Sequence, residues 1–178
     1  INPTQRNIAT SPDYQGIRIP FIGISNFWRV LVEPGFLPHS IYYTTERKIW
    51  DTKDIYLVNN QLINDKIYLT NLVKCAGRDA SLPKSKRINW GLKILTEEIN
   101  IVKPKLIITF GQMPFRALIG QNIHLADHYQ KVLSGDLKFY DLALEGRKYK
   151  VFPTYFPTGR GRPKKSIEIL KFLKSQND

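Results

Sequence analysis

The stretch Pro104-Lys105-Leu106-Ile107-Ile108-Thr109-Phe110-Gly111 decides the fold. Its centre, 105–110, is short and almost wholly apolar, which is typical of a β-strand covered on both faces. Upstream, apolar residues from Ile88 to Val102 recur at steps of four and three, so an amphipathic helix is expected there. That helix should end before Pro104, because the residue before a proline avoids helical geometry. Downstream, a short helix is expected at 112–119, so the stretch predicts a helix–strand–helix unit.

More strands and helices are expected on either side of this unit. Segments rich in β-branched and aromatic residues are typical of strands, whereas an N-cap residue or a proline before spaced apolar residues marks the start of a helix. By these signals, strands are expected at 66–73 and 148–154 with a strand end at Ile1, and helices after Ser25, across 44–60 and from Pro163.

Strands that alternate with helices predict a largely parallel sheet with helices on both faces. No internal repeat, low-complexity tract or linker interrupts the pattern. We therefore expect one domain over residues 1–178, of α/β class, built as a three-layer α/β/α sandwich around a short, mainly parallel four-stranded sheet.

The charge balance points to a polyanionic partner. Lys and Arg total 27 against 15 Asp and Glu, a net charge of +12, which favours nucleic acid first and an anionic membrane surface second. No apolar run is long enough to span a bilayer, so no membrane segment is expected. With one cysteine and three histidines, neither a disulfide framework nor a structural metal site is expected, and the cell interior is the natural compartment.

In parallel sheets, ligands bind beyond the carboxyl ends of the strands. The residues that follow the expected strands are therefore candidates for a site. They are Asn2-Pro3-Thr4, Thr70-Asn71, Phe110-Gly111-Gln112 and Phe156-Pro157-Thr158-Gly159-Arg160.

These segments resemble motifs of the uracil-DNA glycosylase superfamily, in the right order and over nearly the whole chain. Ile1-Asn2-Pro3-Thr4 resembles the Gly-Ile-Asn-Pro-Gly motif of the mismatch-specific uracil/thymine-DNA glycosylases, and 21–36 resembles that family's next run. Pro20-Phe21-Ile22-Gly23 and 68–75 are similar to Pro-Phe-Val-Gly and Tyr-Ile-Thr-Asn-Val-Val-Lys-Cys of the iron–sulfur branch. Segment 156–160 stands where the family has His-Pro-Ser or Asn-Pro-Ser-Gly.

Three departures from the family pattern stand out. The sequence opens inside the first motif, so we expect a preceding first strand that is missing here. Phe156 replaces the His or Asn of the last motif. Cys75 matches a cluster ligand of the iron–sulfur branch, yet a cubane cluster needs about four thiolates, so no cluster and no other cofactor is expected.

The resemblance implies roles for several residues, each with a plainer alternative. Asn2 would position the attacking water, or it begins an Asn-Pro turn. Phe21 would stack on a flipped base, or it is a core side chain. Asn71 would read the base edge, or it caps a strand end. Phe156 and Thr158 would line the substrate pocket.

The last motif and the helix after it would form a DNA-facing loop, or simply a solvated basic loop. Glycine lets backbone approach phosphates closely, and a helix N-terminus favours anions. Arg160 would fill the gap that the flipped base leaves. The candidate DNA-binding residues are Gly159, Arg160, Arg162, Lys164 and Lys165.

Taken together, the resemblance implies a monofunctional glycosylase that cuts uracil from DNA and leaves an abasic site. The expected partner is DNA containing uracil or another deaminated base, and the expected state is a monomer in the cytoplasm, nucleoid or nucleus. Two alternatives stay open. One is a glycosylase for another lesion, such as hypoxanthine or mismatched thymine, and the other is a non-catalytic DNA-binding relative, which Phe156 favours.

Overall fold

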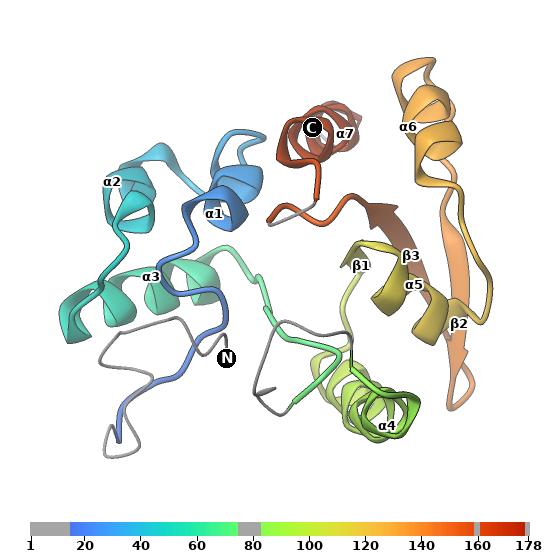
Figure 1. Ribbon diagram of the computed structural model, residues 1–178, viewed down its shortest axis with the longest axis horizontal. Helices are drawn as coiled ribbons and strands as arrows, with labels where there is room; N and C mark the ends of the chain where they lie inside the picture. The colour runs from blue at the N-terminus through green and yellow to red at the C-terminus, as the bar shows by residue number, and fades with distance from the viewer. Residues whose placement is uncertain (1–14, 75–82, 159–160, 177–178) are drawn as a thin grey trace.

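The computed structural model describes residues 15–74, 83–158 and 161–176, and it is of mixed α/β class (Figure 1). Helices account for about half of the described chain, and the strands form a small sheet. In chain order the elements are α1 (Ser25–Val32), the 3-10 turn η2 (His39–Ile41), α2 (Tyr42–Glu46), α3 (Thr52–Asn64), α4 (Ser85–Val102), β1 (Leu106–Phe110), α5 (Gln112–Ile119), α6 (Leu125–Leu133), β2 (Tyr140–Leu144), β3 (Arg147–Thr154) and α7 (Pro163–Ser175).

The sheet contains three strands in the order β1-β3-β2. Strands β1 and β3 run parallel, with Leu106 opposite Lys150 and Phe110 opposite Thr154. Strand β2 joins β3 as an antiparallel hairpin. The two residues between them, Glu145 and Gly146, both have positive φ (46° and 77°), the backbone that a tight two-residue hairpin turn requires.

Much of the element pattern predicted from the sequence is confirmed. Strands β1 and β3 lie where 105–110 and 148–154 were expected, and α4, α5 and α7 match the predicted helices. Helix α4 ends at Val102, and its C-cap Lys103 is left-handed with φ 50°, so the helix stops directly before the proline as expected.

Other expectations are wrong or unconfirmed. Segment 66–73 is not a strand; its chain runs along α4 instead of pairing in the sheet. The four-stranded, mainly parallel sheet is not confirmed, because the described residues form three strands, one of them antiparallel. Ser25 is the first residue of α1 rather than its cap. Region 44–60 holds two helices, because Asp51 ends the loop between them with a capping box at the start of α3.

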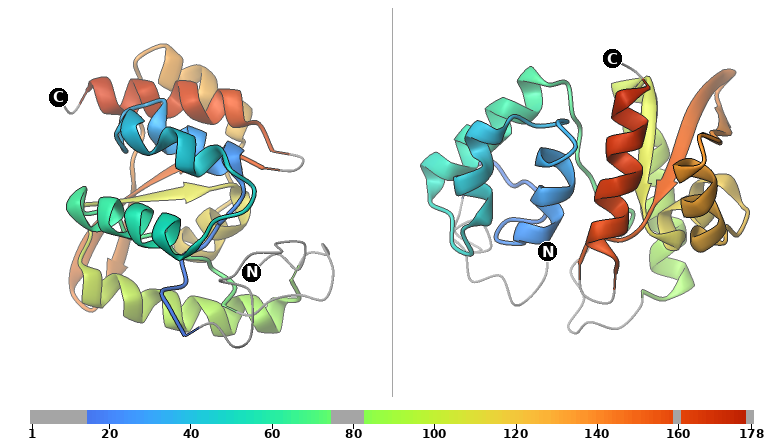
Figure 2. Two further views of the ribbon diagram at one scale, coloured as in Figure 1. Left: turned by 90° about the vertical axis from the view of Figure 1, so that its left-hand side faces the viewer. Right: turned by 90° about the horizontal axis from the view of Figure 1, so that it is seen from above.

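Helices contact both faces of the sheet. On one face, Phe152 packs against His128 of α6 at a ring distance of 5.2 Å, and Thr154 and Ser166 of α7 share a buried 3.0 Å hydrogen bond. On the other, Phe115 of α5 packs edge-on against Tyr140 at 4.8 Å. Figure 2 shows α7 between the sheet and helices α1–α3. Among the described residues no helix is both long and apolar enough to span a membrane.

The carboxyl ends of β1 and β3 meet at one edge of the sheet. The Gly111 N–H, just beyond β1, donates to the Thr154 carbonyl at the end of β3 at 2.8 Å. Gly111 has a φ of 91°, and a Cβ placed on it would lie 3.3 Å from Cβ of Phe156. The chain leaving β1 is therefore held against the chain leaving β3, and the two motifs that follow these strands become neighbours.

Candidate functional site

A row of aromatic rings leads to this edge of the sheet. The ring of Phe21 lies almost parallel to the ring of Phe27, with 3.7 Å between centroids and 13° between planes. Phe27, on α1, meets Phe110 at the end of β1 with 5.5 Å between centroids. We call Phe21, Phe27 and Phe110 the aromatic row. It connects a turn near the start of the described chain to the sheet edge where Phe156 lies.

The backbone of Phe21 adopts a conformation that costs free energy. Its φ is +64°, in the left-handed region that residues with a Cβ seldom occupy. Two donors hold its carbonyl in place: the Ile24 N–H at 3.1 Å and the Trp28 indole Nε1–H at 2.8 Å. Strain of this kind persists only where the surroundings enforce it, and it gathers at functional sites. The turn therefore presents the ring of a half-buried phenylalanine in one fixed direction.

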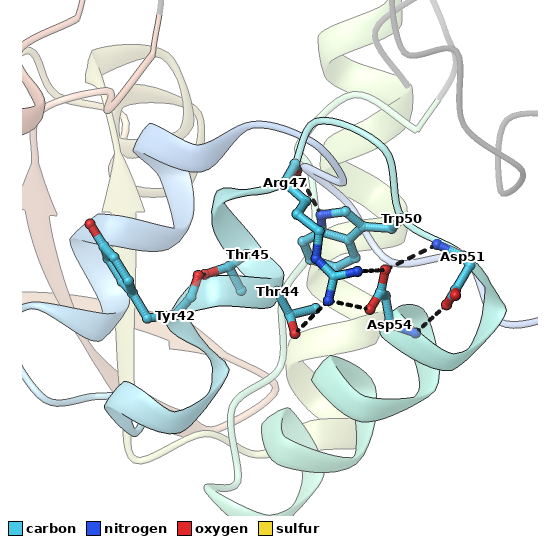
Figure 3. Close-up of polar contacts among 7 residues, drawn as sticks. All are labelled: Tyr42, Thr44, Thr45, Arg47, Trp50, Asp51 and Asp54. Carbon is cyan, nitrogen blue, oxygen red and sulfur yellow. Dashed lines mark hydrogen bonds and ion pairs between the residues drawn. The ribbon is translucent and has the colours of Figure 1, made fainter.

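A polar network in the segment 47–54 contacts this turn and helix α1, and Figure 3 shows its side chains. The Arg47 guanidinium pairs with both carboxylate oxygens of Asp54, at 3.1 and 3.0 Å, and the Trp50 indole N–H donates to the Arg47 carbonyl at 2.9 Å. Trp50 in turn packs against Trp28 at 5.3 Å. The next residue of the same loop, Lys48, contacts the turn directly, because a Cβ on Gly23 would lie only 2.3 Å from its carbonyl oxygen.

Asn71 is half-buried in the segment between α3 and α4. Within the described part of the chain its side chain has no hydrogen-bond or ion-pair partner. The residues on either side of it are bonded to α4: Thr70 to Glu98, and Lys74 to the same carboxylate. No ring contact or hydrogen bond of the described residues joins Asn71 directly to the aromatic row.

Two backbone hydrogen bonds between described residues join the two ends of the loop after β3. The Phe156 carbonyl accepts from the Arg162 N–H at 3.0 Å, and the Thr158 carbonyl accepts from the Gly161 N–H at 2.9 Å. A Cβ on Gly161 would lie 1.7 Å from the Phe156 oxygen, so this position must be glycine. Inside this loop, the side chain of Phe156 is 42% exposed and Thr158 is half-buried.

The loop leads into the basic first turn of α7. Arg162 stands at the N-cap, Pro163 is the first helical residue, and this turn has no acidic side chain. Lys164 is exposed. The Lys165 ammonium instead lies over the ring of Tyr129, 4.3 Å from its centroid. Burial raises the pKa of the neighbouring Tyr155, and the positive charge of Arg162 opposes that rise.

The remaining predicted residues, Asn2, Gly159 and Arg160, lie outside the described residues, as does Cys75. The part of the chain that the structure describes contains no group of three or more His, Cys, Asp or Glu able to hold a metal ion. Sequence reasoning missed Trp28, which donates to the Phe21 carbonyl, and Glu98, which accepts from Thr70 and Lys74. Trp28 had a weak signal, because it belongs to the same aromatic run as Phe27, whereas Glu98 had none.

Comparison with known proteins identifies the family. The family model of the uracil DNA glycosylase superfamily matches residues 8–175. The chain is also similar to the type-4 uracil-DNA glycosylase of Saccharolobus solfataricus, with 32% identity over 96 residues, and to that of Sulfurisphaera tokodaii, with 26% over 96 residues. Each match covers 54% of this chain and 43% or 42% of the relative, so the chain matches less than half the length of these relatives. Because the family model covers nearly all of the sequence, the chain belongs to the uracil DNA glycosylase superfamily.

Proposed function

We propose that this chain is a monofunctional DNA glycosylase that flips uracil out of DNA and hydrolyses its N-glycosidic bond, leaving an abasic site. The observation that carries the proposal is the ring of Phe21, held on a left-handed turn and backed on one face by Phe27. A flipped base needs a rigid π-surface to lie against. Family membership and the names of the two relatives support uracil as the base.

Cleavage of the glycosidic bond requires the protein mainly to position the attacking water and the base. Cleavage of a glycosidic bond passes through an oxocarbenium-like sugar, so a weak nucleophile suffices if it is held in place. We assign Asn2 to hold the attacking water, because a side-chain amide oxygen accepts a hydrogen bond from water without being a strong base. A neutral amide and water need no metal or organic cofactor, and we propose none.

Asn71 is proposed to read the base. Uracil presents an N3–H donor beside an O4 acceptor, and one amide in a fixed orientation accepts from the first and donates to the second. Cytosine presents the opposite pattern and would leave polar groups unpaired in the pocket. Asn71→Asp should therefore lose uracil excision, because a carboxylate repels O4, and it should gain weak activity on cytosine. If Asn71→Asp excises uracil at the original rate, Asn71 does not read the base.

DNA is proposed to lie across the loop after β3 and the start of α7. Gly159, Arg160, Arg162 and Lys164 would contact phosphates, with Arg160 filling the space of the flipped base, and the net charge of +12 would strengthen binding. Lys165 would add long-range charge and, through Tyr129, hold α6 beside α7. Phe156 and Thr158 would line the pocket.

The complete domain is proposed to be a single three-layer α/β/α unit with a four-stranded sheet, acting as a monomer. The outer edge of β1 pairs with no strand among the described residues, and a fourth strand would add there in parallel.

The decisive experiment is single-turnover excision from oligonucleotides that differ in one base. Uracil, hypoxanthine and mismatched thymine are compared in single and double strands, with Asn2→Ala as the inactive control. Excision of uracil that Asn2→Ala abolishes supports the proposal. Excision of hypoxanthine or thymine alone would mean another lesion, whereas binding of every oligonucleotide without excision would mean a non-catalytic relative. Phe156 favours the non-catalytic relative, because phenylalanine offers no donor to the base oxygen.

A further inference from the structure

The segment that carries Asn71 is bonded to helix α4 around one carboxylate oxygen. Thr70 Oγ1 donates to Glu98 Oε2 at 2.9 Å, and Lys74 Nζ donates both to the same Oε2 at 2.5 Å and to Thr70 Oγ1 at 2.6 Å. The three side chains form a closed triangle in which Lys74 donates to both partners, Thr70 accepts from Lys74 and donates to Glu98, and Glu98 accepts from both. Its charged members are mostly buried, since the side chains of Lys74 and Glu98 are only 15% and 22% exposed.

A second contact fixes the same segment further along α4. A Cβ on Gly91 would lie 1.9 Å from the Leu72 carbonyl oxygen, so glycine alone lets the segment approach the helix this closely. Gly91 and Glu98 are seven residues apart, which is about two helical turns and places them on one face. Asn71 lies in sequence between the residues that make the two contacts.

Other side chains of the same segment lie near Glu98 or in the hydrophobic core. Tyr68 shares the Glu98 side of the segment: its pKa is raised by burial first and by the negative charge of Glu98 second. Leu69 and Val73 pack against the hydrophobic core. Leu72 is itself a buried core residue, so the core holds the segment directly beside Asn71.

We propose that Glu98, together with Lys74, is a positioning residue that holds the Asn71 amide in the one orientation that reads uracil. This inference rests on the proposed function, in which Asn71 is the base reader. An amide that rotates or shifts presents its donor and acceptor to either base edge, so its discrimination depends on a rigid backbone. A partly buried ion pair such as Lys74–Glu98 adds little to stability compared with apolar packing. We therefore assign it the role of fixing the geometry of the segment that carries Asn71.

The test compares Glu98→Ala and Glu98→Gln with Glu97→Ala, an exposed glutamate one residue away on the same helix. The first readout is hydrogen exchange of the backbone over 70–74 in the free protein, which needs no activity. Glu98→Ala should exchange faster there than both wild type and Glu97→Ala. Glu98→Gln should keep most of the protection, because its amide oxygen still accepts from Thr70 and Lys74.

The second readout is steady-state kinetics on oligonucleotides that contain uracil or cytosine. For Glu98→Ala we expect kcat/KM on uracil to fall about 10- to 100-fold, mainly through a higher KM, and the preference for uracil over cytosine to narrow. Glu98→Gln should recover most of this loss, and Glu97→Ala should match wild type.

Two results would overturn the inference while leaving the proposed function intact. One is hydrogen exchange in Glu98→Ala that equals that of wild type. The other is faster exchange in Glu98→Ala with unchanged kinetics and unchanged base preference. A wild-type chain that excises no uracil would instead refute the proposed function, and the exchange readout would then decide alone whether Glu98 holds the Asn71 segment. If Glu98→Ala does not fold, Gly91→Ala loosens the same segment from its other contact, and it should show the same faster exchange and weaker base preference. If it shows neither, the inference falls.

Discussion

Replacing Phe21 by glycine should separate two effects: the contribution of the ring to excision, and the free-energy penalty of the left-handed backbone at this position. Glycine occupies φ +64° without the penalty of about 1–2 kcal/mol that a side chain incurs in the left-handed region. The substitution loses the stacked pair with Phe27, worth about 0.5–1.5 kcal/mol, and half of a phenylalanine burial, worth about 1 kcal/mol.

These effects nearly cancel, so the free energy of unfolding of Phe21→Gly should stay within about 1 kcal/mol of wild type. Truncating a fully buried core phenylalanine would instead cost about 3–5 kcal/mol. The excision rate of Phe21→Gly should fall much more, because the flipped base loses about 1–3 kcal/mol of stacking on the ring. This loss corresponds to a rate about 5- to 150-fold lower.

The assay pairs urea denaturation with single-turnover excision from a uracil oligonucleotide. Phe21→Ala keeps the strained backbone but not the ring, so it should be less stable than Phe21→Gly by about 1 kcal/mol and equally slow. Lys103→Gly is the matched control, since Lys103 has φ 50° at the end of α4, and it should gain stability without changing excision. A stability loss above about 3 kcal/mol in Phe21→Gly would assign Phe21 to the core, and wild-type excision would refute the stacking role.

Three further outcomes are expected. Phe156→His should raise the single-turnover rate, by up to the roughly 10²–10³-fold that one donor to a developing oxyanion contributes; no gain in a folded variant would mean that the pocket is arranged for another base. Neutralising Arg162 and Lys164 together should weaken binding to all DNA sequences alike and flatten the salt dependence by about one unit per lost phosphate contact, and an unchanged slope would move the DNA face elsewhere. Burial lowers the pKa of His128, so the unfolded chain binds its proton at higher pH than the folded chain. The free energy of unfolding should therefore fall as pH drops below 6.5 through the folded pKa, and a His128→Gln variant that keeps the same pH slope in urea denaturation would contradict this.

The sequence by itself determined the local elements whose signals lie within a few residues. The apolar run of β1, the stepped pattern of α4 with Pro104 beyond it, and Pro163 at the first position of α7 all act through neighbouring atoms, so they could be predicted. Motif order was likewise enough to select the family and to single out Phe21, Asn71 and Phe156 as candidates.

Tertiary structure decided what depends on distant partners. Segment 66–73 has the composition of a strand, yet contacts with Glu98 and Gly91 on α4 hold it beside a helix instead. Strand β2 forms because a hairpin turn delivers it to β3.

The left-handed turn of Phe21 is set in the same way, by an indole hydrogen bond from Trp28 and by the contact of Gly23 with Lys48. Each of these outcomes is the balance of a local preference of about 1 kcal/mol against packing and hydrogen bonds of similar or larger size, and those partners are identified only once the chain has folded.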